Sequence, residues 1–112
     1  MRGNHQTNRI FMSMDKTTAL EHAKHYAVLV YNEVPSCKVF LYGSLANGNF
    51  NENSDIDIAV VQDFLDDNYW ELTKKINRLT RNIDNRIEPV LLQPQDNQSG
   101  FLSTVLKSGI EL

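Results

Sequence analysis

The sequence predicts a single α/β domain of the α+β type, in which a small mixed β-sheet has helices packed mainly on one side. Three short segments, at residues 37–42, 55–61 and 86–93, are mostly apolar and have the length of strands. In the segments around them, apolar residues recur at the spacing of one helix face. The 112 residues contain no repeat and no linker, so we expect one hydrophobic core.

The N-terminal part is expected to be a disordered extension followed by a long helix. Residues 1–12 are polar and show no periodicity, so the domain is predicted to span residues 13–112. Ser13 or Asp15 can cap a helix that ends near Glu33, just before Pro35. The apolar positions of this helix recur at helical spacing: Leu20, Ala23, Ala27, Val30 and Val34.

The remaining elements are expected in the order strand, strand, helix, strand, helix. The apolar strand 37–42 suits a position with both faces covered. A turn over 43–48, with up to one helical turn, and a polar loop then lead to strand 55–61. A helix over 66–83 precedes strand 86–93, and a loop over 94–98 precedes a helix over 100–108. The stripe expected to be buried in the helix 66–83 consists of Leu72, Ile76, Leu79 and Ile83.

Composition and charge exclude several classes of protein. The net charge of −3 gives no general attraction to DNA or RNA. The single cysteine, Cys37, cannot form an internal disulfide and is expected to be a reduced, buried thiol. No segment approaches the ~20 apolar residues of a membrane span, and no signal-peptide pattern is present. The expected location is the cytoplasm.

Two carboxylates and a Gly-Ser turn are the strongest functional signal. In a strand over 55–61, alternation places Asp55 and Asp57 on one face. Adjacent carboxylates repel each other unless a cation lies between them, and oxygen ligands suit Mg²⁺ or Mn²⁺. The turn Gly43-Ser44 offers backbone N–H groups and a hydroxyl to a polyphosphate. Together these residues indicate nucleotide chemistry.

Glu88 is a candidate third acid, because two-metal transfer of a nucleotidyl group usually uses three carboxylates. It lies in an otherwise apolar strand, where an unpaired carboxylate is costly to bury. If strand 86–93 lies beside strand 55–61, Glu88 joins Asp55 and Asp57 and can take the proton of an attacking hydroxyl. The alternatives are a chance Asp-x-Asp pair and a sheet-edge Glu88 paired with Arg86 or a lysine. The conjunction of all these parts in one order favours the functional interpretation.

The helix 66–83 also carries aromatic and basic residues, and we interpret these as packing residues and as a solvated surface rather than as a functional site. Tyr69 and Trp70, near its start, are interpreted as packing residues rather than base-stacking residues. A basic run is interpreted as a solvated helix face, with a contact surface for an acidic partner or a triphosphate as the alternative. This run consists of Lys74, Lys75, Arg78 and Arg81.

The candidate site residues lie in a motif that resembles the signature of the DNA polymerase beta-like nucleotidyltransferase superfamily. The motif runs Gly43-Ser44-Leu45-Ala46-Asn47-Gly48 and then Ser54-Asp55-Ile56-Asp57-Ile58-Ala59-Val60. The close similarity is to the smallest members, the minimal nucleotidyltransferases (MNT proteins) of bacteria and archaea. It covers about Leu20 to Leu112.

The resemblance implies a nucleotidyltransferase fold, a reaction and a site. Gly43 and Ser44 would hold the β- and γ-phosphates of a nucleoside triphosphate, with ATP expected, and Asp55, Asp57 and Glu88 would bind the metal ions. An acceptor would attack the α-phosphate in line and release pyrophosphate. The chain departs from the family in lacking a basic residue at Asn47, in having Glu where Asp is frequent as third acid, and in lacking a helical second domain. A partner or a second copy is expected to complete the cleft.

The resemblance also implies the kind of partner. Genes for MNT proteins often pair with genes for HEPN proteins, which are small helical proteins that include RNases. In such toxin–antitoxin pairs the MNT member is the antitoxin and can transfer AMP to a tyrosine of its partner. The expected function is therefore Mg²⁺-dependent adenylyl transfer to a HEPN-type partner. The alternatives are a catalytically silent module that neutralises a partner by contact, and a small-molecule, antibiotic-type nucleotidyltransferase acting as a homodimer.

Overall fold

The computed structural model describes residues 2–65 and 67–112 as helices on the two faces of one sheet. The elements are α1 (Arg2–Glu33), β1 (Cys37–Tyr42), α2 (Gly43–Asn47), β2 (Ile56–Gln62), α3 (Tyr69–Arg78), β3 (Ile87–Leu92), the 3₁₀ turn η1 (Pro94–Asp96), α4 (Phe101–Ser108) and β4 (Ile110–Glu111). The predicted fold class is confirmed. Within these residues, no helix is long and apolar enough to cross a membrane.

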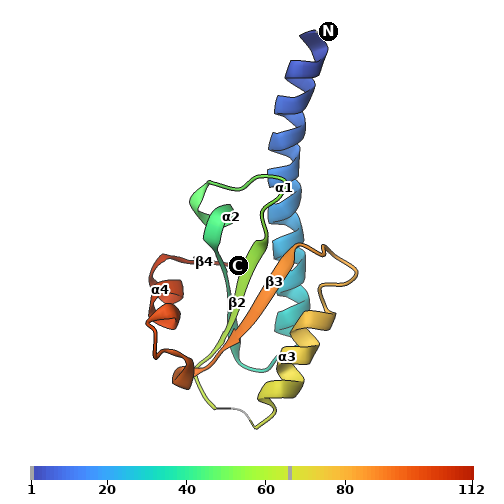
Figure 1. The fold of residues 1–112 in the computed structure, drawn as a ribbon. Coiled ribbons are helices and arrows are strands. Elements are labelled where there is room, and N and C mark those ends of the chain that lie inside the picture. Colours follow the sequence, from blue (N-terminus) through green and yellow to red (C-terminus); the bar gives the residue numbers. More distant parts are fainter. Residues whose placement is uncertain (1, 66) are drawn as a thin grey trace.

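The sheet has four strands in the order β3-β2-β1-β4 (Figure 1). β1 runs antiparallel to β2 and to β4, whereas β2 and β3 run parallel. Ala59 of β2 lies opposite Phe40 of β1 and opposite Val90 of β3. β2 is therefore hydrogen-bonded along both edges, and its register positions residues from three strands side by side.

The sheet has a hydrophobic core on each face. The larger core packs α1, α3 and Leu45 of α2 against one face, and the smaller core packs α4 against the other. In β1, Val39 and Leu41 belong to the larger core while Phe40 belongs to the smaller one. Because side chains alternate along a strand, two covered faces account for the nearly unbroken apolar sequence of this strand.

Two tyrosines of α1 connect the helix to the rest of the domain. The buried hydroxyl of Tyr26 donates a hydrogen bond to the carbonyl of Ile76 in α3, at 2.7 Å, and burial raises the pKa of this hydroxyl. The Tyr31 hydroxyl accepts a hydrogen bond from the N–H of Val39 and donates one to the carbonyl of Leu112, each at 3.0 Å. These contacts hold α1 against α3 and against the C-terminal segment.

Several boundaries differ from those predicted. The helical backbone of α1 begins at Arg2 and so extends on the N-terminal side of the predicted cap at Ser13 or Asp15. Once a helix is formed, each further residue adds a hydrogen bond, and no proline interrupts this stretch. α3 is shorter than the predicted range 66–83, because residues 79–83 form turns, and Asp66 lies outside the described residues. β4 was not predicted, since two residues show no periodicity.

A cluster of charged side chains connects α1 to the start of β3. The Asp84 carboxylate accepts hydrogen bonds from the Arg86 guanidinium at 2.9 and 3.1 Å, from the Arg86 N–H at 3.0 Å and from His22 Nδ1 at 2.9 Å. Arg86 also contacts Asp15 at 3.1 Å and lies 5.5 Å from the ring centre of Phe50. Although burial opposes the charged form, the hydrogen bonds from Arg86 and His22 hold the pKa of Asp84 below its usual range.

We predict that Asp84→Asn lowers the free energy of unfolding by about 2–4 kcal/mol at pH 7. The reason is that the partly buried charge of Arg86 then faces a neutral amide instead of a carboxylate. A carboxyl whose pKa is lowered on folding stabilises the protein above its unfolded pKa of about 4, and this contribution is lost as the pH falls below that value. Urea unfolding from pH 7 to about pH 2 should show the difference between wild type and variant becoming smaller.

The matched control is Glu71→Gln. Glu71 contacts Lys74 at 3.8 Å and both side chains are exposed, so the change should alter stability by less than about 0.5 kcal/mol. An Asp84→Asn deficit that stayed constant across this pH range would contradict the assignment to a charge interaction.

Candidate active site

The register of the sheet brings Tyr42, Asp57 and Glu88 into one row. Tyr42 of β1 lies opposite Asp57 of β2, and Asp57 lies opposite Glu88 of β3. Since Asp57 alternates with the residues of the larger core, all three lie on the face of the sheet that α4 covers farther along. The condition set for Glu88, that strand 86–93 lies beside strand 55–61, is therefore met.

Asp57 lies among other negative charges. Burial raises the pKa of its carboxyl, and the charges of Asp55 and Glu88 raise it further. The pKa of the Tyr42 hydroxyl is raised by burial and then by the charges of Asp57 and Glu88. No ion pair between described residues involves any of the three acids. The row thus has a concentration of negative charge that a bound cation would relieve.

Gly43 connects this row to α2. The helix begins directly after β1, and Gly43 has a φ of +74°, a conformation that side chains with a Cβ rarely adopt. A Cβ at this position would collide with the Oδ2 atom of Asp57. At the other end of α2, the N–H groups of Gly48 and Asn49 bond to the carbonyl of Ser44. The absence of a side chain at Gly43 lets the backbone of the Gly-Ser turn approach the Asp57 carboxylate closely.

The donor set fits a hard divalent cation, although it is not preassembled. Asp55, Asp57 and Glu88 offer only carboxylate oxygens, which Mg²⁺ and Mn²⁺ prefer. Residues 2–65 and 67–112 nevertheless contain no group of three or more His, Cys, Asp or Glu side chains arranged to hold a metal ion. Mg²⁺ sites in nucleotide enzymes commonly combine one or two carboxylates with phosphate oxygens, so these residues match a metal that binds together with its nucleotide.

Glu88 lies at the edge of the sheet, but it is not paired with Arg86 as the structural alternative would require. β3 is an edge strand and the Glu88 side chain is exposed, so the expected cost of burying this acid does not arise. Arg86 interacts with Asp84 and Asp15 and not with Glu88. Glu88 therefore has no cationic partner among the described side chains.

Tyr42 and Phe101 are neighbours of the site that sequence patterns did not indicate. Phe101, the first residue of α4, makes a T-shaped contact with Tyr42, with ring centres 5.3 Å apart and an interplanar angle of 75°. The only available signal was the position of Tyr42 directly before Gly43. Tyr42 packs against Phe101 of α4 and lies opposite Asp57, so its ring is an apolar boundary at the β1 end of the row.

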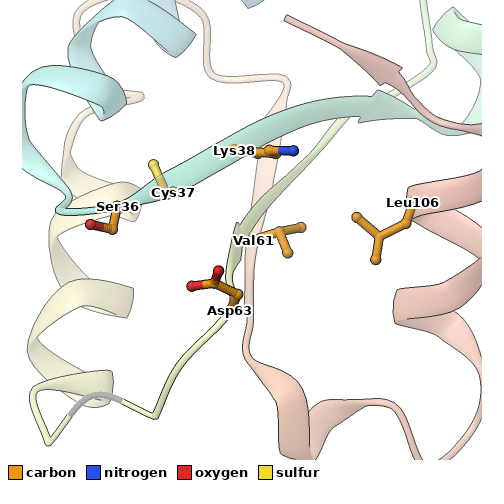
Figure 2. Close-up of a pocket in the computed structure, with 6 residues that line it drawn as sticks. All are labelled: Ser36, Cys37, Lys38, Val61, Asp63 and Leu106. Carbon is orange, nitrogen blue, oxygen red and sulfur yellow. The ribbon is translucent and has the colours of Figure 1, made fainter.

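A separate hollow of about 410 Å³ lies away from the acids. Figure 2 shows that it opens between the sheet and Leu106 of α4. It is lined by Ser36, Cys37, Lys38, Val61, Asp63 and Leu106. Cys37 lies at the far end of β1 from Tyr42 and is half-buried, and burial raises the pKa of its thiol, so it is a poor nucleophile. This hollow contains none of the predicted site residues.

Comparison with solved structures finds the same fold in a candidate nucleotidyltransferase and in two toxin–antitoxin structures. A candidate nucleotidyltransferase from Sulfolobus solfataricus is 21% identical with a TM-score of 0.63, and the match covers 86% of this chain and 80% of that one. A mutant of the toxin–antitoxin MntA-HpeT is 24% identical with a TM-score of 0.53, covering 80% and 70%. A toxin–antitoxin solved with AMP-PNP is 24% identical with a TM-score of 0.50, covering 86% and 70%. At these identities the likeness shows the fold alone.

Comparison of sequences gives the family. No curated protein sequence matches the chain significantly. The family profile described as polymerase beta, nucleotidyltransferase, matches residues 24–112, which include β1 to β4 and all the acids of the row. Because this match spans most of the chain, the chain belongs to the polymerase beta nucleotidyltransferase family.

Proposed function

We propose that this protein transfers a nucleoside monophosphate, AMP from ATP, to an acceptor hydroxyl in a Mg²⁺-dependent reaction. The observation that carries the proposal is the concentration of negative charge around Asp57, directly beside the backbone of Gly43. A structural protein gains nothing from unpaired acids at this position, whereas a metal–nucleotide complex would neutralise them.

The Gly-Ser turn and the three acids have distinct roles in this proposal. Gly43 and Ser44 bind the β- and γ-phosphates, and the position of Gly43 beside Asp57 brings these phosphates close to the acids. Asp55, Asp57 and Glu88 hold the metal, which when bound offsets the charge that develops on the attacking and leaving oxygens. The acceptor oxygen attacks the α-phosphorus, the bond to the β-phosphate oxygen breaks, and pyrophosphate leaves. Glu88, exposed at the edge, takes the acceptor proton.

For the acceptor we propose a hydroxyl of a HEPN-type partner protein, with this chain acting as the antitoxin of the pair. Family membership and the motif support this proposal, and two solved structures of the same fold are named as toxin–antitoxins. A partner, or a second copy of this chain, would also supply the part of the cleft that a small sheet leaves open.

One observation favours a second candidate function. Because the described carboxylates do not form a ready-made metal site, the domain could bind and neutralise its partner without catalysis. The two candidates are separated by incubating the protein with ATP labelled at the α-phosphate, Mg²⁺ and a lysate of the source organism. Label on a discrete protein supports transfer, and label on a small molecule supports an antibiotic-type enzyme. No label in any fraction, together with a co-purifying partner, supports the binding module.

We predict that Asp57→Asn reduces label transfer by at least about 100-fold while leaving the fold intact. The variant removes the carboxylate that the other two acids repel, so its melting temperature without metal should equal or exceed that of the wild type. Transfer at the wild-type rate by this variant would eliminate the proposed metal role of Asp57.

We predict that Gly43→Ala reduces transfer by about 100-fold, because its Cβ displaces the Asp57 carboxylate. Gly48→Ala is the matched control: Gly48 has a φ of +89°, but a Cβ there meets no atom within 4 Å. Both variants should lose about 1–2 kcal/mol of stability to backbone strain. Equal loss of activity in the two variants, at equal stability, would show that strain and not contact with Asp57 is responsible.

A further inference from the structure

A stripe of cationic and aromatic side chains runs along the exposed side of α3, on the far side from its buried residues Leu72 and Ile76. Residues at i, i+4, i+7 and i+8 share one helix face, and here they are Trp70, Lys74, Asn77 and Arg78. Thr73 flanks this face and Arg81 follows in the turn after α3. We call these six residues the α3 stripe.

The part of the α3 stripe that follows Trp70 in the chain lines a hollow that suits anions. The hollow is about 360 Å³ and is lined by Thr73, Lys74, Asn77, Arg78 and Arg81, with no acid among them. Arg78 and Arg81 form no ion pair with any described side chain, and Lys74 has only the weak, exposed contact with Glu71 at 3.8 Å. In a chain of net charge −3, this is a local concentration of unbalanced positive charge.

Uncharged hydrogen-bonding groups lie in the same hollow. The Oγ1 atom of Thr73 is buried and has no hydrogen-bond partner, and it is alone in this respect among the described side chains. Asn77 donates from Nδ2 to the carbonyl of Thr73 at 2.8 Å, which leaves its Oδ1 oxygen as an acceptor. An acceptor beside cations would match a hydroxyl that lies next to a phosphate.

Solvation and the helix dipole account for exposed cations, but they do not account for the exposure of the Trp70 ring. Cations in the last turn of a helix are favoured by its dipole, which explains Arg78. Trp70, however, is 73% exposed at the start of the same face, and its ring touches Tyr69 in a T-shaped contact at 5.2 Å. An exposed aromatic ring in line with cations is the pattern on which unpaired bases stack while the backbone is neutralised.

We propose that the α3 stripe is a docking surface for single-stranded RNA. A base stacks on Trp70, phosphates contact Lys74, Arg78 and Arg81, and a 2′-hydroxyl donates to the Oδ1 atom of Asn77. α3 packs on the opposite face of the sheet from Asp57 and Glu88, so bound RNA leaves the proposed nucleotide site free. This surface is independent of the proposed transferase function.

The test uses the fluorescence of Trp70, which is the single tryptophan of the chain. A mixed-sequence 12-nucleotide RNA is titrated into the full-length protein at several salt concentrations, and the same titration is made with DNA of the same sequence and with a polyglutamate peptide. We expect RNA to quench the fluorescence saturably and to bind more tightly than the other two. DNA or polyglutamate binding as tightly as RNA, or no saturable binding of RNA, would overturn the proposal.

Variants distinguish the α3 stripe from general electrostatics. Arg78→Gln/Arg81→Gln should raise the dissociation constant at least about tenfold and flatten its salt dependence by about 1.4 in log–log slope. The charge-matched control Lys24→Gln/Lys107→Gln, at exposed positions on α1 and α4, should change it less than about threefold. Equal weakening in both double variants would refute a local site. Asp57→Asn should bind RNA as the wild type does, so loss of transfer and loss of RNA binding are separable.

Discussion

The pairing of β2 along both of its edges is the constraint on which the site depends. Antiparallel pairing with β1 and parallel pairing with β3 place Tyr42, Asp57 and Glu88 in one row, although they are far apart in the chain. A shift of one residue in either pairing would turn Asp57 into the apolar core or move Glu88 to the other face. The hydrophobic alternation of β2, with Ile56, Ile58 and Val60 inside, makes such a shift very unfavourable.

Two groups of carboxylates in this small domain have opposite electrostatic surroundings. Asp84 is surrounded by donors from Arg86 and His22, so its charge contributes to the stability of the α1–β3 junction. Asp57 is partly buried and lies near Asp55 and Glu88, so its charge opposes folding. The first group holds the loop between α3 and β3 against α1.

The sequence was sufficient for local structure and for the family. The bounds of β1 and the buried stripe of α1 follow from periodicity, which is a property of neighbouring residues. The Gly-Ser turn and the Asp-x-Asp pair indicated the site because their spacing is also local. The proximity of Tyr42, the exposure of Glu88 and the Asp84–Arg86 contacts depend on strand order and on the path of the loop after α3. No periodicity encodes these, and the shared row could be foreseen only as a condition on strand pairing.

The position of β3 at the edge of the sheet determines what can reach Glu88. In the described part of the chain no strand lies beyond β3, and the Glu88 side chain is exposed. No neighbouring strand of the described chain therefore limits the size of a molecule that approaches Glu88 from that side. A macromolecule could therefore present a single hydroxyl to this edge. The rest of that macromolecule would then lie beyond the sheet and be held by contacts elsewhere on the domain.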